Sequence, residues 1–254
     1  VKKDPELDKW LVCDIEHYAA LIEIQFHKRL DKGKLLLSKC IKNLLYENDN
    51  HYLSVKSRIF TTFANHYSSD KNSKDYINES IEIKKQLSDK PGLARSYGSL
   101  SRLLFTENPI SNETLEATKK WFIINEENKD IFGIIFSRNF LGKIYFNIHK
   151  TNQSKDDNLK NSKQQYNENI KLLKNKIDPG SQIQIFTSFA DLMEIAKFEK
   201  DENTFLDLSS KLYNLLNDFE KIENNFFIDI FKNAFSSKFK NAVYSKQNIK
   251  EILS

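Results

Sequence analysis

The residues of this sequence that could bind a metal are few and scattered. Cys13 and His17 stand four positions apart, so on a helix both side chains could reach one metal ion. A tetrahedral site requires two further ligands, and no second pair in the sequence has that spacing. The other histidines show no mutual spacing: His27, His51, His66 and His149. The sequence therefore predicts no metal site and implies no cofactor.

Motifs for nucleophilic catalysis and nucleotide binding are absent from the sequence. No serine stands in a G-x-S-x-G elbow, and the phosphate-binding pattern G-x-x-x-x-G-K-[ST] does not occur. Solvation accounts for paired carboxylates such as Glu126-Glu127 and Asp156-Asp157. We therefore expect a protein that is not an enzyme. An enzyme with an unrecognised site is the alternative, and turnover of a bound ligand would reveal it.

The composition favours a helical chain with a hydrophobic core. Hydrophobic residues make up 39% of the 254 residues, whereas only 6 Gly and 4 Pro are present, too few for a sandwich or barrel that turns every ten residues. The net charge of +4 is mild, so an acidic partner is permitted but not required. Two cysteines, a charged N-terminus and the lack of a long apolar stretch predict a reduced, cytoplasmic chain without a membrane span.

One sequence motif, called the repeated phrase below, occurs four times. DIFGIIFSRNFLGKIYF at residues 130–146 matches DKPGLARSYGSLSRLLF, which begins 41 positions earlier at Asp89. Further copies lie at 49–65 and 178–195, offset by 40 and 48 positions. A second segment follows the same offsets: CIKNLL from Cys40, SIEIKK from Ser80, WFIINE from Trp121 and NIKLLK from Asn169. Self-similarity at this period is typical of a helical solenoid, in which each helix pair buries its apolar face against the next.

The repeat predicts the order of the helices. A single domain of 1–254 is expected, with an N-terminal helix within 1–29, repeats over about 30–217 and capping helices over 218–254. The expected helices are 5–29, 33–46, 51–68, 72–88, 92–107, 113–127, 130–148, 158–175, 181–198, 202–218 and 222–240. Small residues at Thr61, Ser101, Gly142 and Ala190 are expected to let paired helices approach closely.

The repeats resemble the tetratricopeptide repeat family, whose pattern includes W-x2-L-G-x2-Y. Leu141-Gly142-Lys143-Ile144-Tyr145 carries L-G-x2-Y intact, and Ser162 followed by Tyr166 resembles the A-x3-F half. The resemblance implies an all-α fold, a right-handed α-α superhelix of antiparallel helix pairs. It also implies a scaffold or sensor that binds a protein or peptide in its concave groove. The chain resembles the repeat arms that sense ligands or partners in larger signalling and defence proteins. Because it starts with Val, we expect it to be an excised domain of a larger protein.

Counting along the first helix of each repeat predicts which residues face that groove. The partner-binding candidates are Arg58, Asn65, Arg95, Arg102, Phe105, Phe136, Asn139, Lys143 and Phe146. A guanidinium group pairs with a carboxylate through two hydrogen bonds, so the cations of this set could bind an acidic peptide. A solvated helix face is the structural alternative. The functional alternative is a helical repeat that binds nucleic acid, in which the cations contact phosphates and the Phe rings stack on bases.

The C-terminal segment has a second possible role. Phe227, Phe231, Phe235 and Phe239 form a stripe that is surrounded by lysines. A basic amphipathic helix of this kind can dock on a membrane surface or in a partner's groove. We expect it instead to cap the solenoid, because an uncapped end would expose apolar surface.

Overall fold

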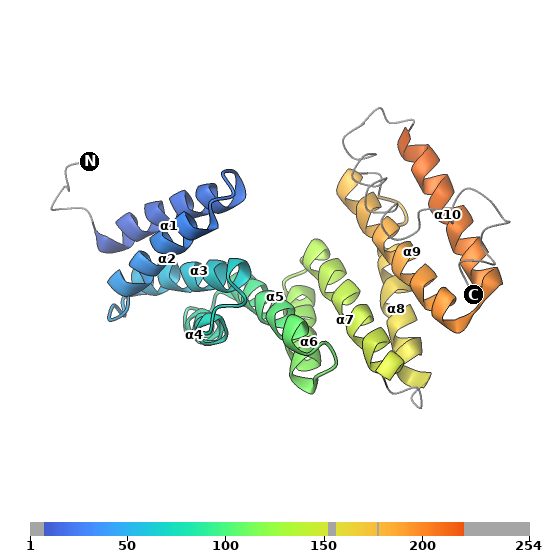
Figure 1. Ribbon diagram of the computed structural model, residues 1–254, viewed down its shortest axis with the longest axis horizontal. Helices are drawn as coiled ribbons and strands as arrows, with labels where there is room; N and C mark the ends of the chain where they lie inside the picture. Colours follow the sequence, from blue (N-terminus) through green and yellow to red (C-terminus); the bar gives the residue numbers. More distant parts are fainter. Residues whose placement is uncertain (1–7, 152–155, 177, 221–254) are drawn as a thin grey trace. The chain divides into compact units, whose positions relative to one another are not determined.

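The computed structural model describes residues 8–151, 156–176 and 178–220 (Figure 1). Within these ranges the chain forms ten α-helices and no strand. They are α1 (Lys9–Gln25), α2 (Leu30–Asn43), α3 (Asn50–His66), α4 (Ser73–Gln86), α5 (Lys90–Glu107), α6 (Asn112–Glu127), α7 (Ile131–Thr151), α8 (Asp156–Leu173), α9 (Pro179–Glu199) and α10 (Glu202–Glu220). The predicted all-α fold is confirmed, and the helix ends lie within about one helical turn of their expected positions. The predicted C-terminal cap with its Phe stripe lies mostly outside the described residues.

An aspartate starts each repeated phrase because it caps a helix. The carboxylate of Asp49 accepts a hydrogen bond from the backbone N–H of His51 at the start of α3, at 2.8 Å. Asp89 does the same for Gly92 at the start of α5, at 2.9 Å. These bonds satisfy backbone donors that have no partner inside the helix. The remaining copies of the phrase begin in the same way: Asp130 accepts from Gly133 N–H and Asp178 from Ser181 N–H.

Two of these aspartates, Asp89 and Asp130, follow a residue in the left-handed region of backbone conformation. Ser88 and Lys129 have φ values of 55° and 56°, and each directly precedes a capping aspartate. The backbone N–H of Asp89 donates back to the carbonyl of Lys84, and that of Asp130 to the carbonyl of Asn125. One residue pair thus ends one helix and begins the next.

The helices pack against their neighbours in chain order, which makes the described chain a helical-repeat solenoid. α1 packs on α2, α3 on α4, α5 on α6, and α9 on both α8 and α10. α3 also contacts α1 and α5, so these three helices form one layer. The described part of the chain divides into two compact units, with the boundary between Ser137 and Arg138.

Small buried residues allow the close approach that the repeat predicts. A Cβ atom added at Gly142 would lie 2.6 Å from Tyr166 Cζ, so only glycine leaves room for the tyrosine ring. Ser73, Thr114 and Ser162 are fully buried. Their hydroxyls donate to the backbone carbonyls of preceding residues, which satisfies the buried polar groups.

Each unit has its own hydrophobic core. In the first unit, residues of α1 to α4 such as Leu37, Ile59 and Phe60 are fully buried. In the second unit, Tyr166 on α8 and Met193 on α9 pack with Phe205 on α10. Among the described helices, none combines the length and the apolar character that crossing a bilayer requires.

Candidate functional site

A cavity of about 710 Å³ opens in the first unit. Most of its lining comes from α1, α3, α5 and the start of α7, and α4 and α6 add a few side chains. Three lining side chains are aromatic and largely exposed: Tyr18 at 56%, and Phe132 and Phe136 at 48% each. Their exposure leaves ring surface that a ligand could cover.

Five of the nine predicted partner-binding residues line this cavity. They are Arg58, Asn65, Arg95, Arg102 and Phe136. The resemblance placed them on the groove side of their helices, and the structure places them together at one cavity. Whether they bind a partner stays a prediction.

Arg58 and Arg102 form polar contacts with other side chains of the protein, whereas the Arg95 guanidinium has none among the described residues. Arg58 pairs with Asp14 of α1 through an Nη2–Oδ1 distance of 2.9 Å. Arg102 donates to Asn65 Oδ1 at 3.3 Å, and its guanidinium carbon lies 5.8 Å from the centre of the Trp121 ring. Arg95 is exposed, and its guanidinium forms no hydrogen bond or ion pair within the described part of the chain. Arg95 is therefore the cation most available to a ligand.

His17 contributes a neutral imidazole to the cavity. Its Nε2 lies 2.8 Å from Thr62 Oγ1, and its side chain is buried. Burial, together with the charge of Arg58, lowers the pKa of His17 to about 4, although Asp14 opposes the shift. Its Nδ1 has no hydrogen-bond partner among the described residues. His17 is thus neutral at physiological pH.

A buried lysine lies in the cavity beside a cluster of hydroxyls. Lys84 on α4 is 3% exposed, and its Nζ donates to Thr61 Oγ1 at 2.8 Å and to Ser96 Oγ at 2.7 Å. Ser80 Oγ lies 2.9 Å from the Thr61 hydroxyl and donates to the Ser57 carbonyl. This cluster joins α3, α4 and α5 through hydrogen bonds in place of apolar contacts.

The charge of Lys84 is destabilised by its surroundings. Burial lowers its pKa to about 8, and the positive charges of Arg95 and Arg58 act in the same direction, whereas Asp89 opposes them. No carboxylate within the described residues forms an ion pair with the Lys84 ammonium. Lys84 therefore remains mostly protonated at neutral pH without a counter-ion of its own.

Asn125 on α6 is a second buried polar residue of the cavity. It is 2% exposed, and its Nδ2 has no hydrogen-bond partner among the described residues. Gly133 on α7 makes space for it, because a Cβ atom at that position would lie 2.5 Å from the Asn125 amide. Asn125 thus brings an unused N–H donor to the cavity.

The lining of the cavity carries an excess of positive charge. Its cations are Lys84, Arg58, Arg95 and Arg102, and its carboxylates are Asp89 and Asp130. Four positive against two negative charges leave an excess of two. Both carboxylates are engaged as helix caps. The cavity is therefore chemically suited to an anionic ligand with apolar groups beside the charge.

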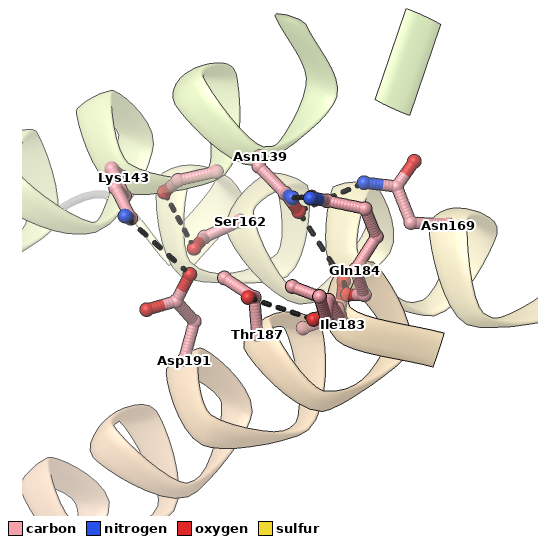
Figure 2. A network of polar contacts seen from close by, with 10 residues as sticks. Asn139, Lys143, Ser162, Asn169, Ile183, Gln184, Thr187 and Asp191 are labelled. Carbon is pink, nitrogen blue, oxygen red and sulfur yellow. Dashed lines mark hydrogen bonds and ion pairs between the residues drawn. The ribbon is translucent and has the colours of Figure 1, made fainter. Parts of the chain in front are cut away.

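The two polar predicted residues of the second unit, Asn139 and Lys143, already have partners (Figure 2). Asn139 on α7 is buried and donates to Gln184 Oε1 at 3.1 Å, while its Oδ1 accepts from Asn169 at 2.8 Å. The Lys143 ammonium lies 3.9 Å from the carboxylate of Asp191. Figure 2 shows these contacts joining α7, α8 and α9. Their observed role is to hold the unit together, and partner binding by Asn139 and Lys143 stays a prediction.

The remaining predicted aromatic residues offer little surface. Phe146 is only 9% exposed, and its ring packs edge-on against Phe198 at 5.5 Å between centroids. Phe105 is half-buried and does not line the cavity. Of the three Phe rings considered for base stacking, Phe136 alone is both exposed and in the cavity.

The cavity residues that the sequence did not predict include the exposed rings of Tyr18 and Phe132 and the buried polar residues Lys84 and Asn125. Lys84 and Asn125 both lie on the second helix of a repeat, whereas the predicted groove residues lie on the first helix. The repeat alignment holds a signal that would have identified them: the equivalent positions in the other copies are Leu44 and Leu173, both apolar. A polar residue in an apolar column indicates either a defect in packing or a ligand site.

The cysteine and histidine pair considered for a metal has other partners. Cys13 Sγ points to the carbonyl of Cys40, and both cysteines are free and buried. Within the described residues, no group of three or more His, Cys, Asp or Glu side chains could hold a metal ion.

Comparison with known proteins adds no relative for this chain: no protein-family model matches it, and no curated protein is significantly similar to it.

Proposed function

We propose that this chain binds a protein or peptide segment of acidic character in the cavity of its first unit, without catalysing a reaction. The cavity of about 710 Å³, with its excess of cations and its exposed aromatic rings, is the observation that supports this proposal most. A peptide presents carboxylates and apolar side chains at short, regular spacing, which suits such a lining. In this proposal the chain is a cytoplasmic recognition arm of a larger signalling or defence protein with tetratricopeptide-like repeats.

A nucleic-acid ligand receives less support from the side chains. The excess of cations would suit phosphates, and the exposed rings of Tyr18, Phe132 and Phe136 could stack on bases, but two of the three Phe rings predicted for that role do not line the cavity. Phe146 is buried in the second unit and Phe105 lies away from the cavity. A folded or extended protein ligand is therefore the better match.

Selection of random peptides on the full chain tests the proposal. Peptides enriched on the wild-type chain are measured by fluorescence polarisation on Arg95→Glu and on the control Lys42→Glu, which changes an exposed cation of α2 outside the cavity. We expect Arg95→Glu to weaken binding at least tenfold and Lys42→Glu to leave it unchanged. No enriched peptide, or equal binding by all three proteins, would refute the proposal.

Two further measurements separate the alternatives. Binding of single-stranded RNA or DNA that is lost in Arg95→Glu and falls steeply with salt would favour a nucleic-acid-binding repeat. Mass spectrometry of a peptide recovered after incubation tests the absence of catalysis. A cleaved or modified peptide would show that the chain is an enzyme.

A further inference from the structure

One position on the second helix of the repeats is buried in all four copies. Its residues are Leu44, Lys84, Asn125 and Leu173, with exposed fractions of 0%, 3%, 2% and 1%. Leucine at the outer two copies is what core packing favours. The two central copies carry a lysine and an asparagine instead, and both of these residues line the cavity.

Packing alone does not account for the lysine. A buried ammonium is costly unless an anion compensates it, and among the described residues Lys84 is hydrogen-bonded only to the neutral hydroxyls of Thr61 and Ser96. The carboxylate of Asp89 lies near enough to influence Lys84, but it caps α5 by accepting from the N–H of Gly92. Asp89 therefore compensates the charge of Lys84 only in part, and no carboxylate of the described residues forms an ion pair with the Lys84 ammonium.

Packing does not account for the asparagine either. Buried N–H groups in folded proteins nearly always have a hydrogen-bond acceptor, and Asn125 Nδ2 has none among the described residues. Gly133 packs directly against this amide, where a side chain would not fit. The cavity thus contains a buried ammonium without an ion-paired carboxylate and a buried N–H donor without an acceptor among the described residues, and a carboxylate group could supply both partners.

We propose that Lys84 and Asn125 together receive one carboxylate group of the bound ligand. One ammonium and one amide match a monoanion with two acceptor oxygens better than a phosphate, which carries more charge and more oxygens. The carboxylate comes from an aspartate or glutamate side chain or from a chain terminus. This inference rests on the proposed function, because it names the group of the peptide that the cavity recognises.

The ionisation of Lys84 reports whether the carboxylate binds there. In the full chain labelled with ¹³C-lysine, the Lys84 signal is assigned by its absence from Lys84→Met and titrated with pH. We expect sodium propionate to raise the pKa of Lys84 relative to sodium chloride at equal ionic strength, and propionamide to leave it unchanged. The charged groups that face Lys84 are Asp89 and Arg95 from α5 and Arg58 from α3, and they are present in both titrations. An unchanged pKa in propionate, or a larger rise in inorganic phosphate, would overturn the carboxylate site.

Peptides from the selection test the two residues directly. We expect Lys84→Met and Asn125→Leu each to weaken binding at least tenfold. Both variants are expected to fold, because the equivalent positions hold Leu44 and Leu173. Lys56→Met is the matched control: Lys56 is also buried, but it pairs with Glu79 at 2.6 Å and does not line the cavity.

Changes to the peptide identify the source of the carboxylate. Each acidic side chain of the peptide is replaced by its amide in turn, and the C-terminus is amidated in a separate peptide. Only one of these changes should lower the affinity tenfold, and it identifies the carboxylate that binds. If peptides bind but neither Lys84→Met nor Asn125→Leu weakens them, the carboxylate site is wrong and the proposed function stands. If no peptide binds but propionate raises the pKa of Lys84, the site stands and the proposed peptide function fails.

Discussion

The charged ammonium of Lys84 is buried, and its burial lowers the free energy of unfolding. Its pKa of about 8 in the folded chain lies below the 10.5 of an ordinary lysine. Below pH 8 both the folded and the unfolded chain hold the proton, and the full cost of burying the charge is present. Between pH 8 and 10.5 the unfolded chain binds more protons, so the free energy of unfolding rises with pH. The difference in pKa corresponds to about 3 kcal/mol.

Replacing this lysine by an apolar residue should therefore stabilise the free protein. We predict that Lys84→Met raises the free energy of unfolding at pH 7 by up to about 3 kcal/mol, because it removes an uncompensated buried charge. This gain in the free energy of unfolding should shrink as the pH rises from about 8 towards 10.5, the pKa of an ordinary lysine. Urea denaturation of both proteins at neutral and alkaline pH measures it. A variant that is less stable than the wild type at pH 7 would contradict the assigned cost.

At the residue scale, the sequence predicted which arginines line the cavity, but it did not predict that Lys84 and Phe146 are buried. Arg58, Arg95 and Arg102 follow from the periodicity of the first helix, because groove-facing positions recur at helical spacing. Lys84 could not be predicted in this way, since a lysine on an amphipathic helix normally lies on the solvated face. The burial of Phe146 was not predicted for the opposite reason: a large apolar side chain at a groove position is also well suited to pack against Phe198.

At the scale of helices, the repeated phrase predicted the elements well because each of its features has a local physical role. The aspartate caps the helix start, and the small residue fixes the helix spacing. Neither role depends on distant parts of the chain. The left-handed joints at Ser88 and Lys129 were not predicted, since neither residue is a glycine or an asparagine, the usual signals for positive φ.

Gly142 tests the role of the small residues. We predict that Gly142→Ala lowers the free energy of unfolding by about 1–3 kcal/mol, because the new methyl group would overlap the ring of Tyr166, which is only 1% exposed. Asn167→Ala, at an exposed position of α8, is the control and should change stability by less than about 0.5 kcal/mol. Chemical denaturation measures both. Equal stability of Gly142→Ala and the wild type would mean that the ring moves without cost.

At the scale of the whole chain, the candidate site belongs to one compact unit. The sequence predicted that the cations from Arg58 to Lys143 face one groove, because a repeat assigns the same face to every copy. The structure divides the described chain after Ser137, and the cavity is lined by residues of the first unit only. A repeat pattern cannot predict such a division, since it describes each copy by its neighbours and not by the extent of the array.

This division predicts different effects for two cations of the same row. We expect Arg95→Gln to weaken the binding of selected peptides at least tenfold, whereas Lys143→Gln leaves their affinity unchanged. Lys143 lies near Asp191 within the second unit and does not line the cavity. Fluorescence polarisation with the same peptides measures both variants. An equal loss in Lys143→Gln would contradict the assignment of the site to residues 8–137.

The column formed by Leu44, Lys84, Asn125 and Leu173 also bears on how repeat proteins acquire new specificities. A duplicated repeat arrives with a leucine-like core position and a backbone that already folds. A single substitution at that position introduces a buried polar group, and the residues that cap and connect the helices stay unchanged. Recognition can then arise one copy at a time, while the other copies continue to supply the stability that the new polar residue costs.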